Sequence, residues 1–253
     1  MPRVMTSTAI DYRSTGIAVR EDLVASQRRA WQSLAATGTW WTGAERVAIA
    51  REARAARRCP YCAERKAALS PYAVFGSHAV ASDLPPAVVD AVHRVVTDPG
   101  RLSRRWAGEV MAAITDAELV ELISIVCMAM LVDGFARAIG AELPALPDPL
   151  PGTPPRVRPT EAIDEGFFVA TIPYAVGSRP EQGLYDANAF VPNVGRGLSL
   201  VPAAVRTARD LMAAHYMTYA QVATDWQPSD RPIDRSQIEL VAARTSAKND
   251  CFY

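Results

Sequence analysis

The sequence predicts an all-α fold made of two related helical modules. Three observations predict this fold class. Apolar residues recur every three or four positions along most of the 253-residue chain, whereas strand-like alternation is scarce. Hydrophobic residues make up 49% of the sequence, which is enough for substantial cores. A helix-cap pattern followed by a cysteine also occurs twice, once in each half of the chain.

The first predicted module covers residues 20–142. Its apolar periodicity predicts helices over Leu23–Leu34, Val47–Ala56 and Val88–Val96. Its longest predicted helix spans about Asp116–Ile139. Thr115 and Glu118 form a capping-box pattern at the start of that helix, and Gly140 is typical of a helix end.

A proline-rich segment at residues 143–159 separates the two predicted modules. Its seven prolines forbid a continuous helix and predict a stiff, extended linker. The second predicted module covers residues 160–253. Periodicity and helix-start signals predict two long helices there, over about Pro202–Trp226 and Asp234–Lys248.

The repeat becomes visible when Cys251 is placed on Cys59, which sets an offset of 251 − 59 = 192 residues. This offset brings Thr42–Glu45 onto Asp234–Gln237. Each of these segments has a side-chain cap followed three residues later by Glu or Gln, the pattern of a capping box. Both copies therefore predict a helix that starts about seventeen residues before a cysteine.

Charge and hydropathy restrict the classes of partner. The 27 basic and 27 acidic side chains balance, so the sequence has no electrostatic footprint for nucleic acid or for an anionic membrane. The first twenty residues lack the apolar core of a signal peptide, and the apolar run near Leu122–Val132 is too short to span a bilayer. We expect a soluble cytoplasmic protein whose partner is a small molecule or another protein.

The motif with the clearest chemistry is Cys59-Pro60-Tyr61-Cys62. Two cysteines with this spacing fit the first turn of a helix, where the helix dipole and free amide groups lower a thiol pKa. The pair alone is compatible with half of a zinc site, a thioredoxin-like site or an inert pair. A thioredoxin-like motif would follow a strand, whereas this one follows a predicted helix.

Zinc would need two further ligands, and the available side chains show no ligand spacing: Cys127, His78, His93 and His215. We expect His78 in a loop and His93 on a helix surface, and assign no catalytic role to either. No metal and no cofactor are therefore predicted.

The end of the sequence carries a second motif, in which eleven residues separate Glu239 from Cys251. It resembles the signature of the alkylhydroperoxidase D and carboxymuconolactone decarboxylase superfamily, which is Glu, eleven residues, Cys-x-x-Cys, three residues and His. The resemblance covers about Pro192 to Tyr253. It implies that Glu239 is the acid of a proton relay and that Cys251 is the resolving thiol.

The resemblance also implies an activity. Members of this superfamily reduce hydroperoxides, take electrons from dithiols or lipoylated proteins, and assemble into homo-oligomers. The same superfamily contains lactone decarboxylases that use no cysteines, and a catalytically inactive binding or oligomerisation module is a further alternative. We expect a thiol or selenol peroxidase with Cys59, Cys62, Glu239 and Cys251 as its site residues.

Both modules depart from the signature. The second is incomplete because the sequence stops at Tyr253, where the peroxide-attacking residue is due. Its ending resembles superfamily members with selenocysteine at that position, so we expect a UGA codon to follow. In the first module, Val47 occupies the position of the relay Glu and Lys66 that of the His. Glu52 is the nearest substitute acid, although we do not assign it that role.

Overall fold

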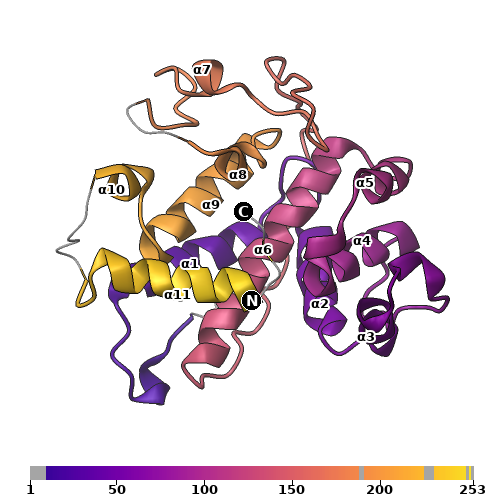
Figure 1. Ribbon diagram of the computed structural model, residues 1–253, viewed down its shortest axis with the longest axis horizontal. Coiled ribbons are helices and arrows are strands. Elements are labelled where there is room, and N and C mark those ends of the chain that lie inside the picture. Colours follow the sequence, from indigo (N-terminus) through magenta and orange to yellow (C-terminus); the bar gives the residue numbers. More distant parts are fainter. Residues whose placement is uncertain (1–9, 188–190, 225–230, 249–250, 252–253) are drawn as a thin grey trace, which may run out of the picture. The chain divides into compact units, whose positions relative to one another are not determined.

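The computed structural model describes residues 10–187, 191–224, 231–248 and 251, and its regular elements over these ranges are helices (Figure 1). It contains eleven α-helices and three short 3-10 helices, and the described residues form no strand. This confirms the predicted all-α class. The chain divides into two compact units. Unit 1 comprises Met1–Val96 and Glu121–Val157, and unit 2 comprises Thr97–Val120 and Arg158–Tyr253.

Unit 1 holds the first helices of the chain. These are η1 (Arg13–Thr15), α1 (Glu21–Ala35), α2 (Gly43–Ala56), α3 (Pro60–Ala67), η2 (Pro71–Ala73), nearly all of α4 (Pro86–Thr97) and most of α6 (Asp116–Ala138). The predicted capping boxes are confirmed. Thr42 and Glu45 exchange hydrogen bonds at the start of α2, and Thr115 and Glu118 do so at the start of α6. Gly140 follows α6 with a φ of 71°, a left-handed conformation that favours glycine.

Helix α6 supplies much of the core. It is apolar around most of its circumference, which is typical of a helix buried on several sides. By length and composition it is also the one described helix apolar enough to cross a membrane, although 61% of that apolar window is buried inside the protein. Two acidic residues of α6 are buried in unit 1. Glu121 pairs with Arg46, and Asp133 forms a bidentate pair with Arg54 at 2.7 and 2.9 Å.

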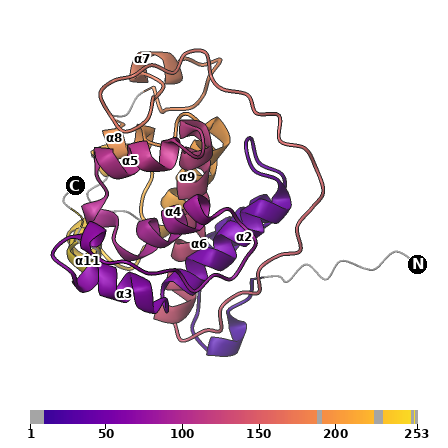
Figure 2. The same ribbon diagram turned by 90° about the vertical axis from the view of Figure 1, so that its right-hand side faces the viewer.

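The proline-rich segment is non-helical, as predicted, but it packs against unit 1 (Figure 2). The Leu150 N–H donates to the Ala35 carbonyl at 2.8 Å, and the Trp31 indole N–H donates to the Ala145 carbonyl at 2.8 Å. These bonds tie residues 143–157 to α1. Residues 143–157 belong to unit 1 and Thr97–Val120 belongs to unit 2, and the predicted module limits stay a prediction.

Unit 2 contains the remaining helices. They are η3 (Pro99–Arg101), α5 (Arg104–Met111), the first turn of α6, α7 (Tyr174–Gly177), α8 (Asn193–Arg196), α9 (Pro202–His215), α10 (Tyr219–Thr224) and α11 (Arg235–Lys248). One of its buried clusters consists of Ile172, Leu184, Tyr185, Val191 and Val205. An ion pair of 2.7 Å between Arg196 and Glu165 connects α8 to the segment that precedes α7.

The predicted helix over Pro202–Trp226 is wrong in its extent, and Trp226 itself lies outside the described residues. The chain leaves the helical conformation at Tyr216, with φ −127° and ψ −97°. A new helix, α10, then begins after Thr218. The Thr218 hydroxyl accepts from the Gln221 N–H at 3.1 Å, while the Thr218 N–H donates to the Gln221 side chain at 3.0 Å. This capping box stabilises a second start and divides the segment in two.

The proposed repeat is consistent with the limits of two helices. Adding the offset of 192 residues to α2 gives 43 + 192 = 235 and 56 + 192 = 248, which are the limits of α11. Asp234 and Gln237 form the predicted capping box of α11. The packing of the two helices differs, because α2 is largely buried whereas Leu240 and Val241 of α11 are 71% and 62% exposed. A common origin of the two modules stays a prediction.

Candidate functional site

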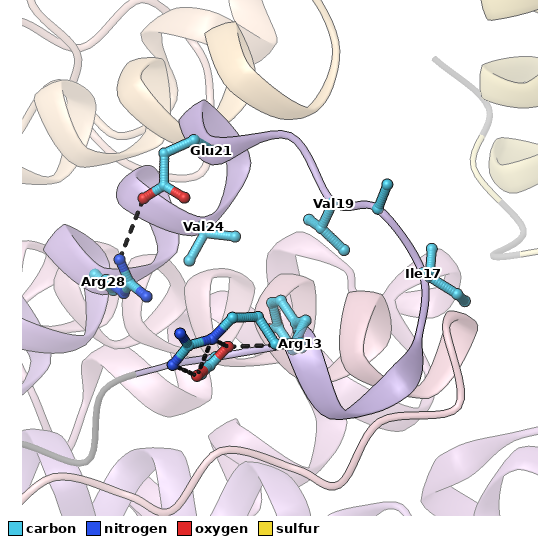
Figure 3. Close-up of a pocket in the computed structure, with 9 residues that line it drawn as sticks. Arg13, Ile17, Val19, Glu21, Val24 and Arg28 are labelled. Atoms are coloured by element: carbon cyan, nitrogen blue, oxygen red, sulfur yellow. Dashed lines mark hydrogen bonds and ion pairs between the residues drawn. The ribbon is translucent and has the colours of Figure 1, made fainter.

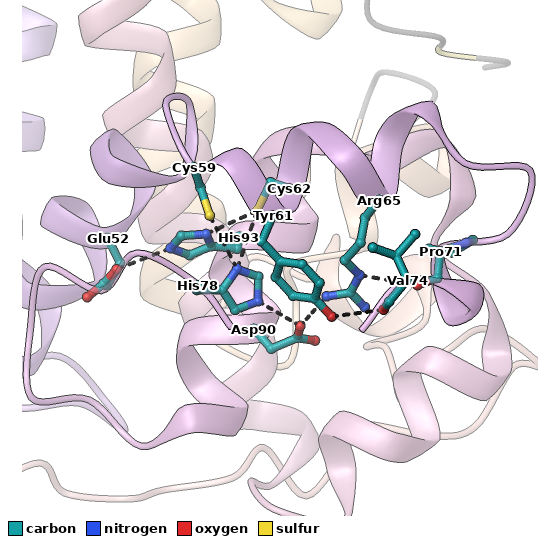
Figure 4. A network of polar contacts seen from close by, with 10 residues as sticks. All are labelled: Glu52, Cys59, Tyr61, Cys62, Arg65, Pro71, Val74, His78, Asp90 and His93. Carbon is teal, nitrogen blue, oxygen red and sulfur yellow. Dashed lines mark hydrogen bonds and ion pairs between the residues drawn. The ribbon is translucent and has the colours of Figure 1, made fainter. Parts of the chain in front are cut away.

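A cluster of two thiols and two imidazoles lies within unit 1, where α2, α3 and α4 meet (Figure 4). Cys59 is the residue before α3, and Cys62 lies in the first turn of that helix, as predicted. Pro60 starts α3, a position in which proline costs no hydrogen bond. His78 comes from the loop before α4, and His93 comes from α4 itself.

The four side chains are close enough to share a proton or a metal ion. One ligand atom from each, two Sγ atoms and two ring nitrogens, can be chosen so that all lie within 4.8 Å of one another. The Cys62 Sγ atom lies 3.2 Å from the Nδ1 atom of His93 and 3.4 Å from the Nδ1 atom of His78. The Cys59 Sγ atom lies 3.8 Å from the same His78 nitrogen. Neither thiol is in a disulfide.

Each imidazole is held from behind by a carboxylate. The Nε2 atom of His93 lies 3.2 Å from Oε2 of Glu52, and the Nε2 atom of His78 lies 2.9 Å from Oδ1 of Asp90. Glu52 also accepts hydrogen bonds from the Ala81 N–H at 2.7 Å and from the Ser82 hydroxyl at 2.6 Å. Because a carboxylate only accepts and the other two neighbours of Glu52 are donors, we assign a proton to the Nε2 atom of His93. When His93 is neutral, its Nδ1 atom then carries no proton, and the lone pair of this atom faces the Cys62 sulfur.

Tyr61 and Arg65 fix the other side of the cluster. The Arg65 guanidinium donates to Asp90 at 2.5 Å and lies over the Tyr61 ring, 5.1 Å from its centroid. The Tyr61 ring also packs edge-on against His78, with centroids 5.0 Å apart. Gly76 permits this arrangement, because a Cβ atom at that position would lie 2.7 Å from the Tyr61 ring. Neighbours of the cysteine pair thus determine where the His78 loop packs.

The surroundings change the pKa values of these groups. Burial alone would raise the pKa of Cys59, but N–H groups of Ala79 and Cys62 and the imidazole of His78 outweigh it and lower the pKa to about 7. Burial would lower the pKa of His78, but Asp90 and the two thiols raise it to about 10. The pKa of His93 is lowered, because burial outweighs the effect of Glu52.

One expectation about this region is wrong. His93 was expected on a helix surface, but it is 0% exposed and contacts Cys62. Glu52, to which no relay role was assigned, is fully buried and bonded to His93, and that assignment stays a prediction. Cys127, considered as a ligand, is exposed and is not a member of the cluster. The sequence carried one usable signal, because Asp90 and His93 are three residues apart and share one face of α4.

The second predicted site lies in unit 2. The Glu239 carboxylate there accepts from the Tyr216 hydroxyl at 2.8 Å and from Arg235 at 2.9 Å. Cys251 is exposed, and its N–H donates to the Ser246 carbonyl at 3.0 Å. Phe252 and Tyr253 lie outside the described residues. The roles assigned to Glu239 and Cys251 therefore stay predictions.

A cavity of about 390 Å³ lies elsewhere in unit 1, beside the segment that leads into α1 (Figure 3). Its walls carry two ion pairs, between Asp11 and Arg13 and between Glu21 and Arg28. No residue of the thiol and imidazole cluster lines this cavity.

Comparisons with protein-family models, with curated proteins and with solved structures found no match to this chain. The cluster at Cys59, Cys62, His78 and His93 therefore has to be interpreted from its own geometry.

Proposed function

We propose that this protein is a thiol-dependent peroxidase in which Cys62 attacks a hydroperoxide and Cys59 resolves the product. One observation carries the proposal: Cys62 contacts His93, and Glu52 holds His93 from behind. A nucleophile, a base and a group that orients the base are the parts of an activated nucleophilic site. The resemblance described above implies the same order, because it assigns the attack to the second cysteine of the pair.

The chemistry can be written with the residues present. The Cys62 thiol gives its proton to His93, and the thiolate attacks the terminal oxygen of ROOH. The O–O bond breaks, the alkoxide takes a proton to leave as ROH, and Cys62 becomes a sulfenic acid. The Cys59 thiolate then attacks that sulfur and releases water. The sum is ROOH and two thiols giving ROH, water and one disulfide.

Cys59 is suited to the second step. It is the residue directly before α3, and N–H groups of Ala79 and Cys62 contribute to the lowering of its pKa, which favours the thiolate. A second dithiol must reduce the Cys59 and Cys62 disulfide before another turnover. The proposed donor is a small dithiol or a lipoylated protein, in a reducing compartment such as the cytoplasm. We also propose, from the resemblance alone, that the protein is a homo-oligomer.

Steady-state turnover tests the proposal. The full chain is supplied with hydrogen peroxide and with dihydrolipoamide as the dithiol, and peroxide loss is followed. We expect catalytic consumption in the unmodified chain and none above background in the Cys62→Ser variant. The Cys59→Ser variant should consume one equivalent and stop as a sulfenic acid, which a dimedone-type probe detects by mass.

Two control variants separate the site from the other thiols. Cys127→Ser and Cys251→Ser remove the two exposed cysteines and leave the cluster unchanged. Cys127→Ser should keep the turnover of the unmodified chain, whereas Cys251→Ser tests whether the resolving thiol assigned by the resemblance takes part. Loss of turnover in Cys251→Ser, together with full turnover in Cys62→Ser, would assign the peroxidase activity to the motif around Cys251 and refute the proposal.

A further inference from the structure

We infer that Cys59, Cys62, His78 and His93 form a four-coordinate site for one Zn²⁺ ion in the reduced protein, and that oxidation of the two thiols releases the ion. The binding half of this inference stands on geometry alone. The release half rests on the proposed function, because that function supplies the hydroperoxide as oxidant. Bound metal and peroxide would then compete for the same pair of thiols.

The spacing of the ligand atoms fits a tetrahedral zinc ion. Zn–S bonds of about 2.3 Å and Zn–N bonds of about 2.0–2.1 Å place sulfur and nitrogen roughly 3.6 Å apart in a tetrahedron. Three of the four Sγ to Nδ1 distances in the cluster are 3.2, 3.4 and 3.8 Å, and the fourth, between Cys59 and His93, is bounded by the 4.8 Å within which one ligand atom of each residue lies. These distances lie on both sides of the tetrahedral value, so a zinc ion requires only small side-chain shifts.

The identity of the ligands selects the metal. Two thiolates and two imidazoles suit Zn²⁺ much better than Mg²⁺ or Ca²⁺, which prefer oxygen ligands. Both histidines present Nδ1 to the sulfurs and use Nε2 to contact a carboxylate, Glu52 or Asp90. Carboxylate contacts of this kind orient metal-binding histidines and increase their basicity.

The electrostatics of the four side chains are also compatible with a bound cation. When His93 is neutral, the lone pair on its Nδ1 atom faces the Cys62 sulfur at 3.2 Å. A thiolate and a lone pair repel each other at this distance unless a proton or a metal ion lies between them. The two cysteines are each 3% exposed and His93 is 0% exposed, so bulk water does not screen that repulsion. A zinc ion would satisfy all four ligand atoms at once.

Burial also indicates the role of the ion. Four protein ligands complete a tetrahedral shell and leave no position for water or substrate, which is typical of structural zinc. The ion would therefore hold α3, α4 and the His78 loop together and slow, without preventing, the reaction of the thiols with peroxide. Oxidation removes both sulfur ligands: the bound thiolates, ROOH and two protons give the disulfide, ROH, water and free Zn²⁺. Two histidines are then too few to retain the ion.

Metal titration of the full chain tests the binding half. The protein is reduced, stripped with a chelator, exchanged into metal-free buffer, and titrated with Zn²⁺ against a chromophoric chelator. We expect one ion per chain. Cys59→Ser and His93→Asn should each weaken binding beyond the roughly 10- to 100-fold loss typical of an outer carboxylate partner. Absence of binding by the fully reduced chain, or unchanged binding in both variants, would overturn the inference.

Two substitutions outside the four ligands test the site with less risk of misfolding. Asp90→Asn removes the carboxylate that contacts both His78 and Arg65, and should weaken Zn²⁺ binding about 10- to 100-fold. Asp83→Asn is the matched control on the exposed loop before α4, and should bind Zn²⁺ as the unmodified chain does. Equal affinity in both variants would argue against His78 as a ligand. Circular dichroism of each variant verifies the helical fold.

The release half is tested on the zinc-loaded chain. Hydrogen peroxide should release one Zn²⁺ for every two thiols lost, and a dithiol reductant should restore binding. Loss of two thiols with the ion retained would overturn the coupling. The metal-free reduced chain is assayed for peroxide consumption in parallel. Zinc binding without peroxide consumption would refute the proposed function and leave the metal site, whereas peroxide consumption without zinc binding would do the reverse.

Discussion

The Nε2 atom of His93 lies 3.2 Å from the Oε2 atom of Glu52, and both side chains are 0% exposed. A buried carboxylate bonded to a buried imidazole is expensive to desolvate unless other donors satisfy it. Ala81 and Ser82 provide those donors. The Nδ1 atom on the other side of the ring is thereby aimed at Cys62. Glu52 is in this way a positioning residue for the base that we assign to the thiol.

Glu52→Gln is therefore expected to slow oxidation of Cys62 without removing the thiol. The amide keeps an oxygen for Ala81 and Ser82 but no longer holds the Nε2 proton of His93 as a charged acceptor. General acid–base catalysis contributes about 10²- to 10⁴-fold, and we expect a loss of about 10²-fold in the rate of thiol oxidation. Stopped-flow measurement with metal-free protein and excess peroxide gives this rate.

Glu64→Gln is the matched control, because Glu64 is an exposed acid on α3 and is not a member of the thiol and imidazole cluster. It should react at the rate of the unmodified chain. A structural role for Glu52 alone would lower the melting temperature and leave the pH profile of thiol oxidation unchanged. A shifted profile is what a positioning role predicts.

The burial of the two thiols predicts selectivity for small oxidants. Cys59 and Cys62 are each 3% exposed, whereas Cys127 and Cys251 are exposed. Hydrogen peroxide should oxidise the buried pair at least about tenfold faster than cumene hydroperoxide, a discrimination within the range that pocket size provides. A bulky aromatic disulfide reagent should show the opposite order and react first with Cys127 and Cys251. Equal rates with both peroxides would contradict a buried reaction centre.

The buried ion pair between Arg46 and Glu121 predicts a large effect on stability. Glu121 is 2% exposed and also accepts the Trp40 N–H at 2.7 Å, so its removal leaves the buried Arg46 guanidinium with only its bonds to Ser33 and the half-buried Trp40 N–H without this acceptor. Glu121→Ala should lower the free energy of unfolding by about 3–5 kcal/mol. Urea denaturation followed by circular dichroism measures this change.

The exposed pair of Arg105 and Glu109 provides the comparison. These residues are 2.8 Å apart on one face of α5, and the side chains are 69% and 48% exposed. Glu109→Ala should cost only about 0.3–0.5 kcal/mol, the value typical of exposed pairs four residues apart on a helix. The burial of Arg46 and Glu121 indicates that this pair is shielded from water. Similar losses of unfolding free energy in Glu109→Ala and Glu121→Ala would contradict that shielding.

A prediction for the second unit concerns alkaline pH. Burial, and then the Glu239 carboxylate, raise the pKa of Tyr216 from 10.0 to about 12. The folded state holds this proton more tightly than the unfolded state, so the stabilising contribution is complete below pH 10 and is lost between about pH 10 and 12. Arg235 acts in the opposite direction because it favours the phenolate.

Glu239→Gln should accordingly lower the pKa of Tyr216, which a titration of phenolate absorbance detects. The chain has eight tyrosines, so the difference between the variant and the unmodified chain is the informative quantity. Tyr216→Phe should abolish that difference. If it persists, another tyrosine responds to Glu239.

Local sequence signals predicted most of the helices because the signals are short. The capping boxes at Thr42, Thr115 and Asp234 each involve side chains three residues apart, and all three are present. The same kind of signal at Thr218 and Gln221 was overridden by the apolar periodicity around it, which led to one helix being predicted where two exist. The apolar periodicity indicates which side of a helix is buried, but it does not indicate where one helix ends and the next begins.

The candidate site was only half visible in the sequence for a different reason. Cys59 and Cys62 are neighbours on one helix turn, so their spacing indicates their chemistry directly. Glu52 and His93 are 41 residues apart, and they meet only because α2 packs beside α4. No local pattern encodes that approach. The same is true of residues 143–157, whose prolines exclude a helix but do not show that the segment packs against α1.

A single-turnover reaction tests the central claim most directly. The Cys127→Ser, Cys251→Ser double variant is reduced, freed of metal and mixed with one equivalent of hydrogen peroxide, and its peptides are mapped without reductant. The account predicts that one equivalent is consumed, that two thiols are lost, and that a disulfide joins Cys59 and Cys62. Retention of both thiols, with peroxide lost no faster than with a simple free thiol, would contradict it.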